Sequence, residues 1–229
     1  MTEVMTKIPT VSVVIPSWNS ESQLKQNLPY VIRAAAAVKA EIVVVDDASA
    51  YDQSAKYLAS LGKKIRFYKN KTNGGFSYTV NRGVSLAKGD LIMLLNTDVR
   101  PSPDCFFRAI KYFTDSSVYA LGFNSGEAWM GGEWGGGLFH HFKVEPDVTN
   151  QNKSNPSLWA SGGQAAFSRS KWRELGGMDL LFKPFYWEDT DMGYRAWKRG
   201  WQVLWAPECR VMHDHQKSVI ASNFTKEFV

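Results

Sequence analysis

Oxygen-bearing side chains follow the apolar run at residues 92–95. Asn96, Thr97 and Asp98 stand directly after this run, so an amide and a carboxylate lie two residues apart at the end of a predicted strand. Such oxygens can hold a divalent cation. A turn capped by asparagine and aspartate has the same spacing, so the spacing alone leaves both interpretations open.

Two imidazoles stand at the end of another apolar run. His213 and His215 flank Asp214, and residues two apart in a strand point to the same face. Neutral imidazole is a good ligand for a transition metal. Without further support, an incidental pair is the simpler interpretation.

An acidic pair, Glu188 and Asp189, opens a predicted helix directly after the aromatic stretch at residues 182–187. Acids in the first turn of a helix often compensate the helix dipole, and Asp191 fits that structural role because it pairs with Arg195 at i, i+4. An acidic pair behind aromatic side chains is partly desolvated, which raises a carboxyl pKa toward that of a general base. Glu188 and Asp189 are therefore candidate catalytic groups.

Glycines precede another predicted helix, in the segment Asn73, Gly74, Gly75 and Phe76. Backbone N–H groups at such a helix start can cradle a phosphate. The segment matches neither the Walker nor the dinucleotide fingerprint, so on its own it does not establish an anion site.

The elements that would position these residues alternate between strands and helices. The predicted strands cover residues 11–15, 42–45, 65–68 and 91–95, and the predicted helices cover residues 21–38, 52–61 and 76–87, with a kink or break at Pro29. This order predicts an α/β fold with a mostly parallel sheet, flanking helices and right-handed crossovers.

Ligands of such sheets bind beyond the carboxyl ends of the strands. Polar residues stand at three of these ends, namely Ser17 and Asn19, Asp46 and Asp47, and Asn96 and Asp98. We therefore expect the three clusters to converge on one crevice.

The second half of the chain is less regular. Residues 124–157 are rich in glycine and tryptophan without periodicity, which predicts a long loop or irregular excursion with room for a short hairpin. Further elements are predicted as helices from Ser170 to Gly176 and over residues 188–199, and as strands near residues 202–205 and 210–213. No linker divides the chain, so we expect one domain over residues 1–229, with a nucleotide-binding half at about 10–123 and an acceptor half at about 124–218.

The composition limits the functional classes. The net charge of +5 suits a diphosphate or an anionic surface, but no lysine or arginine cluster has the density of a nucleic-acid arm, so nucleic acid is not an expected partner. Cys105 and Cys209, far apart in the sequence, indicate a reducing compartment rather than a disulfide scaffold.

The two ends of the chain bear on its location. Residues 1–10 lack the apolar segment of a signal peptide, and no run approaches the ~20 apolar residues of a membrane span. We therefore expect a cytoplasmic protein. Any contact with the membrane would be peripheral and at its inner face. Ile220, Phe224 and Phe228 recur every four residues, as in an amphipathic helix cut short, so a truncated C-terminal tail would supply that contact.

Taken in order, seven segments resemble glycosyltransferase family 2, the inverting family with the GT-A fold, and in particular bacterial rhamnosyltransferase-like cell-surface polysaccharide transferases. The segments are VSVVIPSWN (11–19), VVVDDAS (43–49), NGGFSYTVNRG (73–83), AKGDLIMLLNTDV (87–99), SGGQAAFSR (161–169), GGMD (176–179) and FYWEDTDMGYR (185–195). Each is weak alone, whereas the ordered set covers nearly the whole chain.

The resemblance implies a role for each matching residue. Asp189 would be the catalytic base, with Glu188 holding the acceptor or orienting that base, and Asp98 and His213 would hold Mg²⁺ or Mn²⁺. The nucleotide-binding positions would be Pro16, Ser17, Trp18, Asp47, Asn73, Asn81, Asn96 and Thr97, with Asp47 accepting from a base N–H. The positions near the donor or acceptor sugar would be Gly162, Gly163, Trp159 and Trp187, where packing beneath the site is an equal alternative for the tryptophans.

One residue departs from the family pattern. Asn96 stands where the first carboxylate of the D-x-D motif would be, which weakens the negative charge there and puts its role as a metal ligand in doubt. Ser218 follows His213 at the family's usual spacing.

The resulting expectation is an inverting glycosyltransferase. It would move a hexose or rhamnose from a UDP- or dTDP-linked donor to a glycan or lipid-linked glycan, in bacterial cell-surface polysaccharide synthesis. The alternative is a catalytically inactive module of the same fold that binds a nucleotide-sugar or carbohydrate. A sugar nucleotidyltransferase would need a glycine-rich basic loop after the first strand, where residues 17–20 read SWNS.

Overall fold

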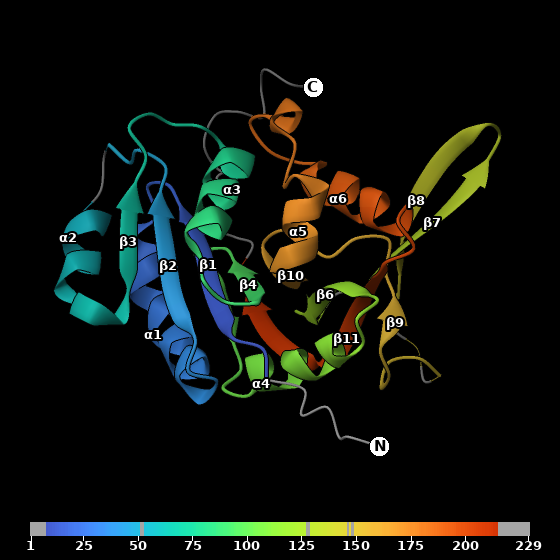
Figure 1. Ribbon diagram of the computed structural model, residues 1–229, viewed down its shortest axis with the longest axis horizontal. Helices are drawn as coiled ribbons and strands as arrows, with labels where there is room; N and C mark the ends of the chain where they lie inside the picture. Colours follow the sequence, from blue (N-terminus) through green and yellow to red (C-terminus); the bar gives the residue numbers. More distant parts are fainter. Residues whose placement is uncertain (1–7, 51–52, 127–128, 146, 148, 215–229) are drawn as a thin grey trace.

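The computed structural model describes residues 8–50, 53–126, 129–145, 147 and 149–214, and it shows a central sheet between layers of helices (Figure 1). The strands are β1 (Val11–Ser17), β2 (Glu41–Asp46), β3 (Arg66–Lys69), β4 (Leu91–Leu95), β5 (Val99–Pro101), β6 (Val118–Asn124), β7 (Trp129–Gly135), β8 (Leu138–Val144), β9 (Asn155–Pro156), β10 (Gln164–Ser168) and β11 (Gln202–His213). The helices are α1 (Glu21–Ala37), α2 (Ser54–Ser60), α3 (Phe76–Leu86), α4 (Cys105–Ile110), α5 (Arg169–Leu175) and α6 (Glu188–Trp197), with short 3₁₀ turns at Gly62–Lys64, Lys111–Thr114 and Leu180–Phe182.

The first four strands form the parallel part of the sheet, as the sequence predicts. β1 pairs in parallel with β2 on one side and with β4 on the other, and β3 extends the sheet beyond β2. The predicted break at Pro29 is wrong, because α1 runs unbroken through this residue. Leu24, Leu28 and Val31 bury the inner face of α1, and their burial offsets the ~3 kcal/mol that an internal proline costs.

Side chains of β1 alternate between two hydrophobic cores. Val13 and Ile15 pack with α1 on one face of the sheet, and Val14 packs with α3 on the other. Both faces are therefore covered by helices, as expected for a strand that reads as a continuous apolar run.

The second half of the sheet is antiparallel in part, which the sequence does not predict. β10 lies antiparallel between β4 and β6, and the strand order is β3-β2-β1-β4-β10-β6-β11-β5, with β9 beside β11. The two strands expected at residues 202–205 and 210–213 are one strand, β11, with a register shift between Ala206 and Arg210. Beyond this shift β11 leaves β6 for β5, the strand that directly follows Asp98.

The segment predicted as a long loop contains a regular hairpin. β7 and β8 pair antiparallel over seven residues each, from Trp129 opposite Val144 to Gly135 opposite Leu138. The hairpin projects from the body at the end opposite α2 and β3 (Figure 1). The sequence pattern allows a short hairpin here but does not place its strands, because both are largely exposed and lack the apolar alternation that marks a half-buried strand.

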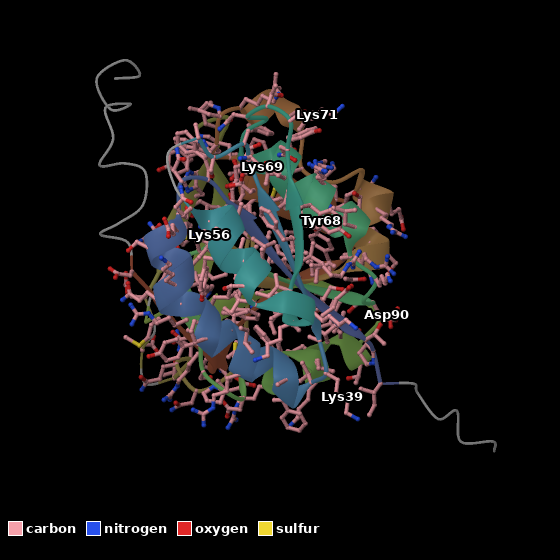
Figure 2. All side chains as sticks on the ribbon, turned by 90° about the vertical axis from the view of Figure 1, so that its left-hand side faces the viewer. Lys39, Lys56, Tyr68, Lys69, Lys71 and Asp90 are labelled. Atoms are coloured by element: carbon pink, nitrogen blue, oxygen red, sulfur yellow. The ribbon has the colours of Figure 1, made fainter. Side chains whose placement is uncertain are left out.

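The edge strand β3 carries basic side chains. Figure 2 looks onto this edge, with Tyr68 and Lys69 on β3, Lys71 just beyond it and Lys56 on α2. Lysines on an edge strand disfavour pairing with another chain. Within the described residues, no helix has both the length and the apolar character needed to cross a bilayer. The predicted tail features at Ile220, Phe224 and Phe228, together with His215 and Ser218, lie outside the described residues.

Candidate active site

The carboxyl ends of β1, β2 and β4 meet at one edge of the sheet. The backbone N–H of Asp47 donates to the carbonyl of Ser17, at 2.7 Å, which joins the ends of β1 and β2. The side-chain amide of Asn27 on α1 donates to the carbonyl of Thr97 at 2.8 Å and holds the turn after β4. The structure thus brings the three predicted polar clusters to the same edge.

Asp47 anchors the glycine loop before α3. Its Oδ1 accepts hydrogen bonds from Asn70 Nδ2 (2.6 Å) and the N–H of Gly74 (2.9 Å), and its Oδ2 accepts from the N–H of Gly75 (2.8 Å). Gly75 has φ +83°, which a residue with a side chain rarely adopts. A carboxylate has about four acceptor sites, so one remains on Asp47 for the predicted base N–H.

The other predicted nucleotide residues are spread along this edge. Pro16 is buried in β1, and Trp18 just after it is 37% exposed. The hydroxyl of Ser17 is buried and has no hydrogen-bond partner within the described residues, and its contact with a nucleotide stays a prediction. Asn73 is exposed, and its Oδ1 accepts from the N–H of Gly75 at 3.2 Å.

Asn81 clamps α3 to the segment that follows α5. Its Nδ2 donates to the carbonyl of Met178 (2.7 Å), and its Oδ1 accepts from the N–H of Met178 (2.9 Å). A Cβ at Gly177, which has φ +79°, would lie 2.5 Å from Asn81 Oδ1. The geometry therefore gives Asn81 a structural role, and direct nucleotide binding by it stays a prediction.

Asp98 and His213 meet although they come from opposite halves of the chain. His213 Nε2 lies 3.2 Å from Asp98 Oδ1, and both side chains are at least nine-tenths buried. That buried Oδ1 nevertheless accepts no hydrogen bond within the described residues. Two ligands at right angles on a cation with ~2.1 Å bonds lie about 3.0 Å apart, so the pair has the spacing of neighbouring metal ligands.

Gln164, which sequence reasoning missed, orients His213. Its Oε1 lies 2.9 Å from His213 Nδ1, and its Nε2 donates to Ser125 Oγ at 3.0 Å. Gln164 presents an acceptor to Nδ1, which leaves Nε2 as the ring nitrogen on the side of Asp98. Such outer contacts fix the tautomer of a metal-binding histidine. A buried glutamine at the start of the apolar run 164–167 was the available signal.

The Asp98–His213 pair fits a divalent cation bound partly by substrate. The described residues contain no group of three or more histidine, cysteine or acidic side chains placed to hold a metal ion. Mg²⁺ is commonly bound by one or two protein side chains together with substrate phosphates, and the orphaned Oδ1 of Asp98 is a ready ligand.

Glu188 and Asp189 open α6 in a desolvated setting, as the sequence predicts. Burial, helped by the charge of Asp189, raises the pKa of Glu188 to about 7, and its buried Oε2 has no hydrogen-bond partner within the described residues. Burial also raises the pKa of Asp189, while hydrogen bonds from the N–H groups of Gly162 (3.3 Å) and Thr190 (2.8 Å) oppose the rise. Asp191 bonds Arg195, which confirms its structural role.

Gly162 and Gly163 bring this acidic pair and the end of β4 together. Asn96 donates its backbone N–H to the carbonyl of Gly163 at 2.8 Å, and a Cβ at Gly163 would lie 2.5 Å from Asn96 Nδ2. The space left by Gly163 is therefore filled by the side chain of Asn96. A Cβ at Gly162 would meet only the flexible ends of Met178 and Phe76, at 3.2 Å and 3.3 Å.

Aromatic side chains border the site on the α6 side. His141 of β8 packs edge-on against Trp159 and Trp187, with ring centroids 5.3 Å and 5.2 Å apart. Tyr186 and Trp187 both have left-handed backbones, at φ +78° and +73°, and both side chains are more than half exposed. Strained residues of this kind cluster at functional sites. Tyr186 and Trp187, directly before Glu188, are thus exposed to solvent and do not cover the acidic pair.

Comparison with known proteins places the chain in a family. Residues 12–176 match the family model "Glycosyl transferase family 2". Polypeptide N-acetylgalactosaminyltransferase 10 from Homo sapiens is 26% identical over 93% of this chain and 39% of its own length. Dolichol-phosphate mannosyltransferase from Pyrococcus furiosus is 33% identical over 49% of this chain and 32% of its own length. The chain thus spans well under half of these relatives.

Solved glycosyltransferase structures share the fold. GalNAc-T7 with UDP, GalNAc and Mn²⁺ superposes with a TM-score of 0.74 at 22% identity, over 91% of this chain and 44% of that one. The mannosyltransferase PcManGT from Pyrobaculum calidifontis, in complex with GDP-Man and Mn²⁺, superposes with a TM-score of 0.71 at 19% identity, over 93% of this chain and 59% of that one. The fold is the predicted GT-A fold, and the chain belongs to glycosyl transferase family 2.

Proposed function

We propose that this chain transfers a sugar from a nucleoside-diphosphate donor to an acceptor hydroxyl, with inversion at the anomeric carbon. One observation carries the proposal: the three-residue segment 162–164 contacts both chemical centres. Gln164 bonds His213 at the metal-ligand pair, and Gly162, two residues earlier, bonds Asp189 at 3.3 Å. A donor sugar between these centres would have a metal-bound diphosphate on one side and a base on the other.

The donor nucleotide lies over the ends of β1, β2 and β4 in this proposal. Pro16 and Trp18 contact the base, and the remaining acceptor site of Asp47 receives a base N–H. The donor is UDP- or dTDP-linked, and the transferred sugar is a hexose or rhamnose.

Asp98 and His213 hold the cation, Mg²⁺ or Mn²⁺, together with the diphosphate. A bound cation supplies charge neutralisation to the departing diphosphate. Asn96, being neutral, leaves the site one negative charge weaker than a D-x-D pair, so more of the cation's affinity depends on the diphosphate.

Asp189 acts as the general base. It takes the proton from the acceptor hydroxyl as that oxygen attacks the anomeric carbon from the face opposite the leaving diphosphate. Glu188, whose pKa is raised by burial to about 7, is partly protonated at neutral pH and can donate a hydrogen bond to the acceptor. The two adjacent carboxyl groups thereby divide the work between proton removal and acceptor orientation.

The acceptor is a glycan or lipid-linked glycan of a bacterial cell surface. The replacement of the first D-x-D carboxylate by Asn96 supports this assignment through the chain's resemblance to rhamnosyltransferase-like members of the family.

Nucleoside diphosphate release tests the proposal. The chain is incubated with Mn²⁺ and a panel of UDP-, dTDP- and GDP-sugars, with and without glycan acceptors, and the anomeric configuration of the product is read by proton NMR. We expect acceptor-dependent release of one diphosphate and an inverted product. Donor binding without turnover on any acceptor would favour the inactive sugar-binding module, and a retained configuration would remove Asp189 as the base of a direct displacement.

A further inference from the structure

A cavity of about 180 Å³ lies beside the metal-ligand pair. Its lining includes Gly122 and Phe123 of β6, Trp205 of β11, Trp129 at the start of β7, and Trp159. In the strand order, β6 and β11 lie beyond β10 from the nucleotide edge at β2, β1 and β4. The cavity is therefore on the acceptor side of Asp98 and His213. We call it the tryptophan pocket.

Two contacts hold the tryptophans in place. The rings of Trp129 and Trp205 lie against each other, with centroids 5.1 Å apart and planes tilted by 33°. Trp159 is fixed by its backbone, because a Cβ at Gly193 of α6 would lie 2.7 Å from Trp159 Cβ, and Ser157 Oγ donates to the Trp159 carbonyl at 2.7 Å. The aromatic walls are thus preorganised.

The three tryptophans that line this cavity carry indole N–H groups without a partner in the described part of the chain. Within the described residues, the indole N–H groups of Trp129, Trp159 and Trp205 donate no hydrogen bond. None of the three indole nitrogens is completely buried. Ser161 and His213 add polar atoms to the wall. A ligand therefore meets apolar ring faces and free donors together.

This combination matches one chemical class. A pyranose ring has a face of C–H groups, which pack on aromatic rings, and an equatorial rim of hydroxyls, which accept from N–H donors. An acyl chain would leave the polar wall atoms unpaired, which costs free energy. The volume is also below the ~300 Å³ at which sites for drug-sized ligands begin, so it suits one sugar ring.

We propose that the tryptophan pocket binds the terminal pyranose ring of the acceptor, which makes the acceptor a glycan whose end sugar is enclosed by protein. The inference rests on the proposed function. Ser161, in the pocket wall, directly precedes Gly162, whose N–H bonds Asp189 at 3.3 Å. A ring in the pocket consequently contacts His213 and the residue that precedes the Asp189 contact at Gly162.

Ligand-observed saturation-transfer NMR tests the inference. The nucleotide edge of the full chain is first filled with an excess of Mg²⁺, free of Mn²⁺, and of whichever of UDP, dTDP or GDP binds. The protein is then titrated with methyl glycosides of rhamnose, glucose, galactose, mannose and N-acetylglucosamine. Trp129→Phe and Trp205→Phe remove an indole N–H and keep an aromatic ring. Trp201→Phe is the matched control, because Trp201 packs on Tyr119 outside the pocket.

We expect at least one glycoside to bind the wild type and the control equally. Each pocket variant should weaken that binding about fivefold, the effect of one lost hydrogen bond of about 1 kcal/mol. Equal binding by all four proteins, displacement of the glycoside by the nucleotide, or no binding across the panel would overturn the inference. A thermal-shift measurement with nucleotide and Mg²⁺ distinguishes the two proposals. If a nucleotide stabilises the protein but no glycoside binds, only the pocket inference is overturned. If no nucleotide stabilises the protein, the proposed function is contradicted.

Discussion

The two binding surfaces that we propose, one in each half of this molecule, are built in different ways. On the nucleotide side, β1, β2 and β4 are buried parallel strands whose ends converge, and Asp47 ties the next loop to them with backbone hydrogen bonds. On the acceptor side, Trp129, Trp159 and Trp205 come from segments that meet only in the folded chain. The first surface follows from local sequence order, and the second depends on long-range packing.

In the proposed function, the reacting groups lie where these halves meet. Asp98 belongs to the first half, whereas His213, Gln164 and Asp189 belong to the second. A variant where the halves meet should therefore impair transfer while each half keeps its own ligand, and the predictions below test that separation.

Asp189→Asn should have the largest effect. Removing a general base lowers turnover by about 10²–10⁴-fold, while nucleotide affinity should stay within about twofold of the wild type. Steady-state diphosphate release and nucleotide titration measure the two quantities. Asp191→Asn, which breaks a structural ion pair with Arg195, is the comparison variant. Unchanged turnover in Asp189→Asn would remove this residue from the mechanism.

Glu188 should make the fold less stable as pH rises. In the folded state the pKa of Glu188 is raised from 4.5 to about 7, so folding favours the protonated carboxyl group. The stabilisation of the folded state that results is complete below pH 4.5 and is lost as the pH rises through 7. The expected loss is about 3 kcal/mol between pH 4.5 and 8.

Urea unfolding of the wild type and of Glu188→Gln across this range checks the effect, with Glu145→Gln at an exposed position as the control. The difference between wild type and Glu188→Gln should shrink toward low pH. A difference that does not change with pH would contradict the burial of this carboxyl group.

Gln164→Leu should weaken cation binding about 10–100-fold, because the orienting acceptor for His213 is lost. Electron paramagnetic resonance of Mn²⁺, with diphosphate nucleotide present, measures the affinity directly. Gln202→Leu removes a glutamine bonded to Ser117, away from the site, and should leave the affinity unchanged. Equal affinities in both variants would mean that Gln164 does not position His213.

Gly136→Ala should have the smallest effect. Gly136 sits in the hairpin turn at φ +58° with open space around it, so alanine costs about 1–2 kcal/mol of local backbone strain without a clash. Hydrogen exchange should speed up at the amides of β7 and β8 and stay unchanged in β1 and β4. Faster exchange in the central strands would show that the hairpin stabilises the body as well.

Much of the nucleotide half was predictable from local pattern. The apolar runs of β1, β2 and β4 end in polar residues, and parallel strands bring such ends together without further information. The acidic pair of α6 was also visible, and burial raises the pKa of both carboxyl groups as expected. The expected cause was wrong for Tyr186 and Trp187, because these aromatic residues are themselves exposed.

The acceptor half was less predictable for physical reasons. β10 is a five-residue strand whose antiparallel place between β4 and β6 depends on partners far along the chain. The role of Gln164 depends on its contact with His213, which is distant in the sequence. Likewise, the need for glycine at position 163 depends on the side chain of Asn96, which fills the space there. Cys105 and Cys209, distant in sequence, are both buried, and neither forms a disulfide.

The change of partner along β11 has a consequence for the proposed cation site. β11 pairs with β6 as far as Arg210 and with β5 from Val211 to His213, and the second pairing sets His213 opposite Val99, the residue after Asp98. Asp98 and His213 come from distant parts of the sequence, so their pair exists only once β11 has joined the sheet. In the proposed function, the cation site is therefore completed by the last strand of the described residues.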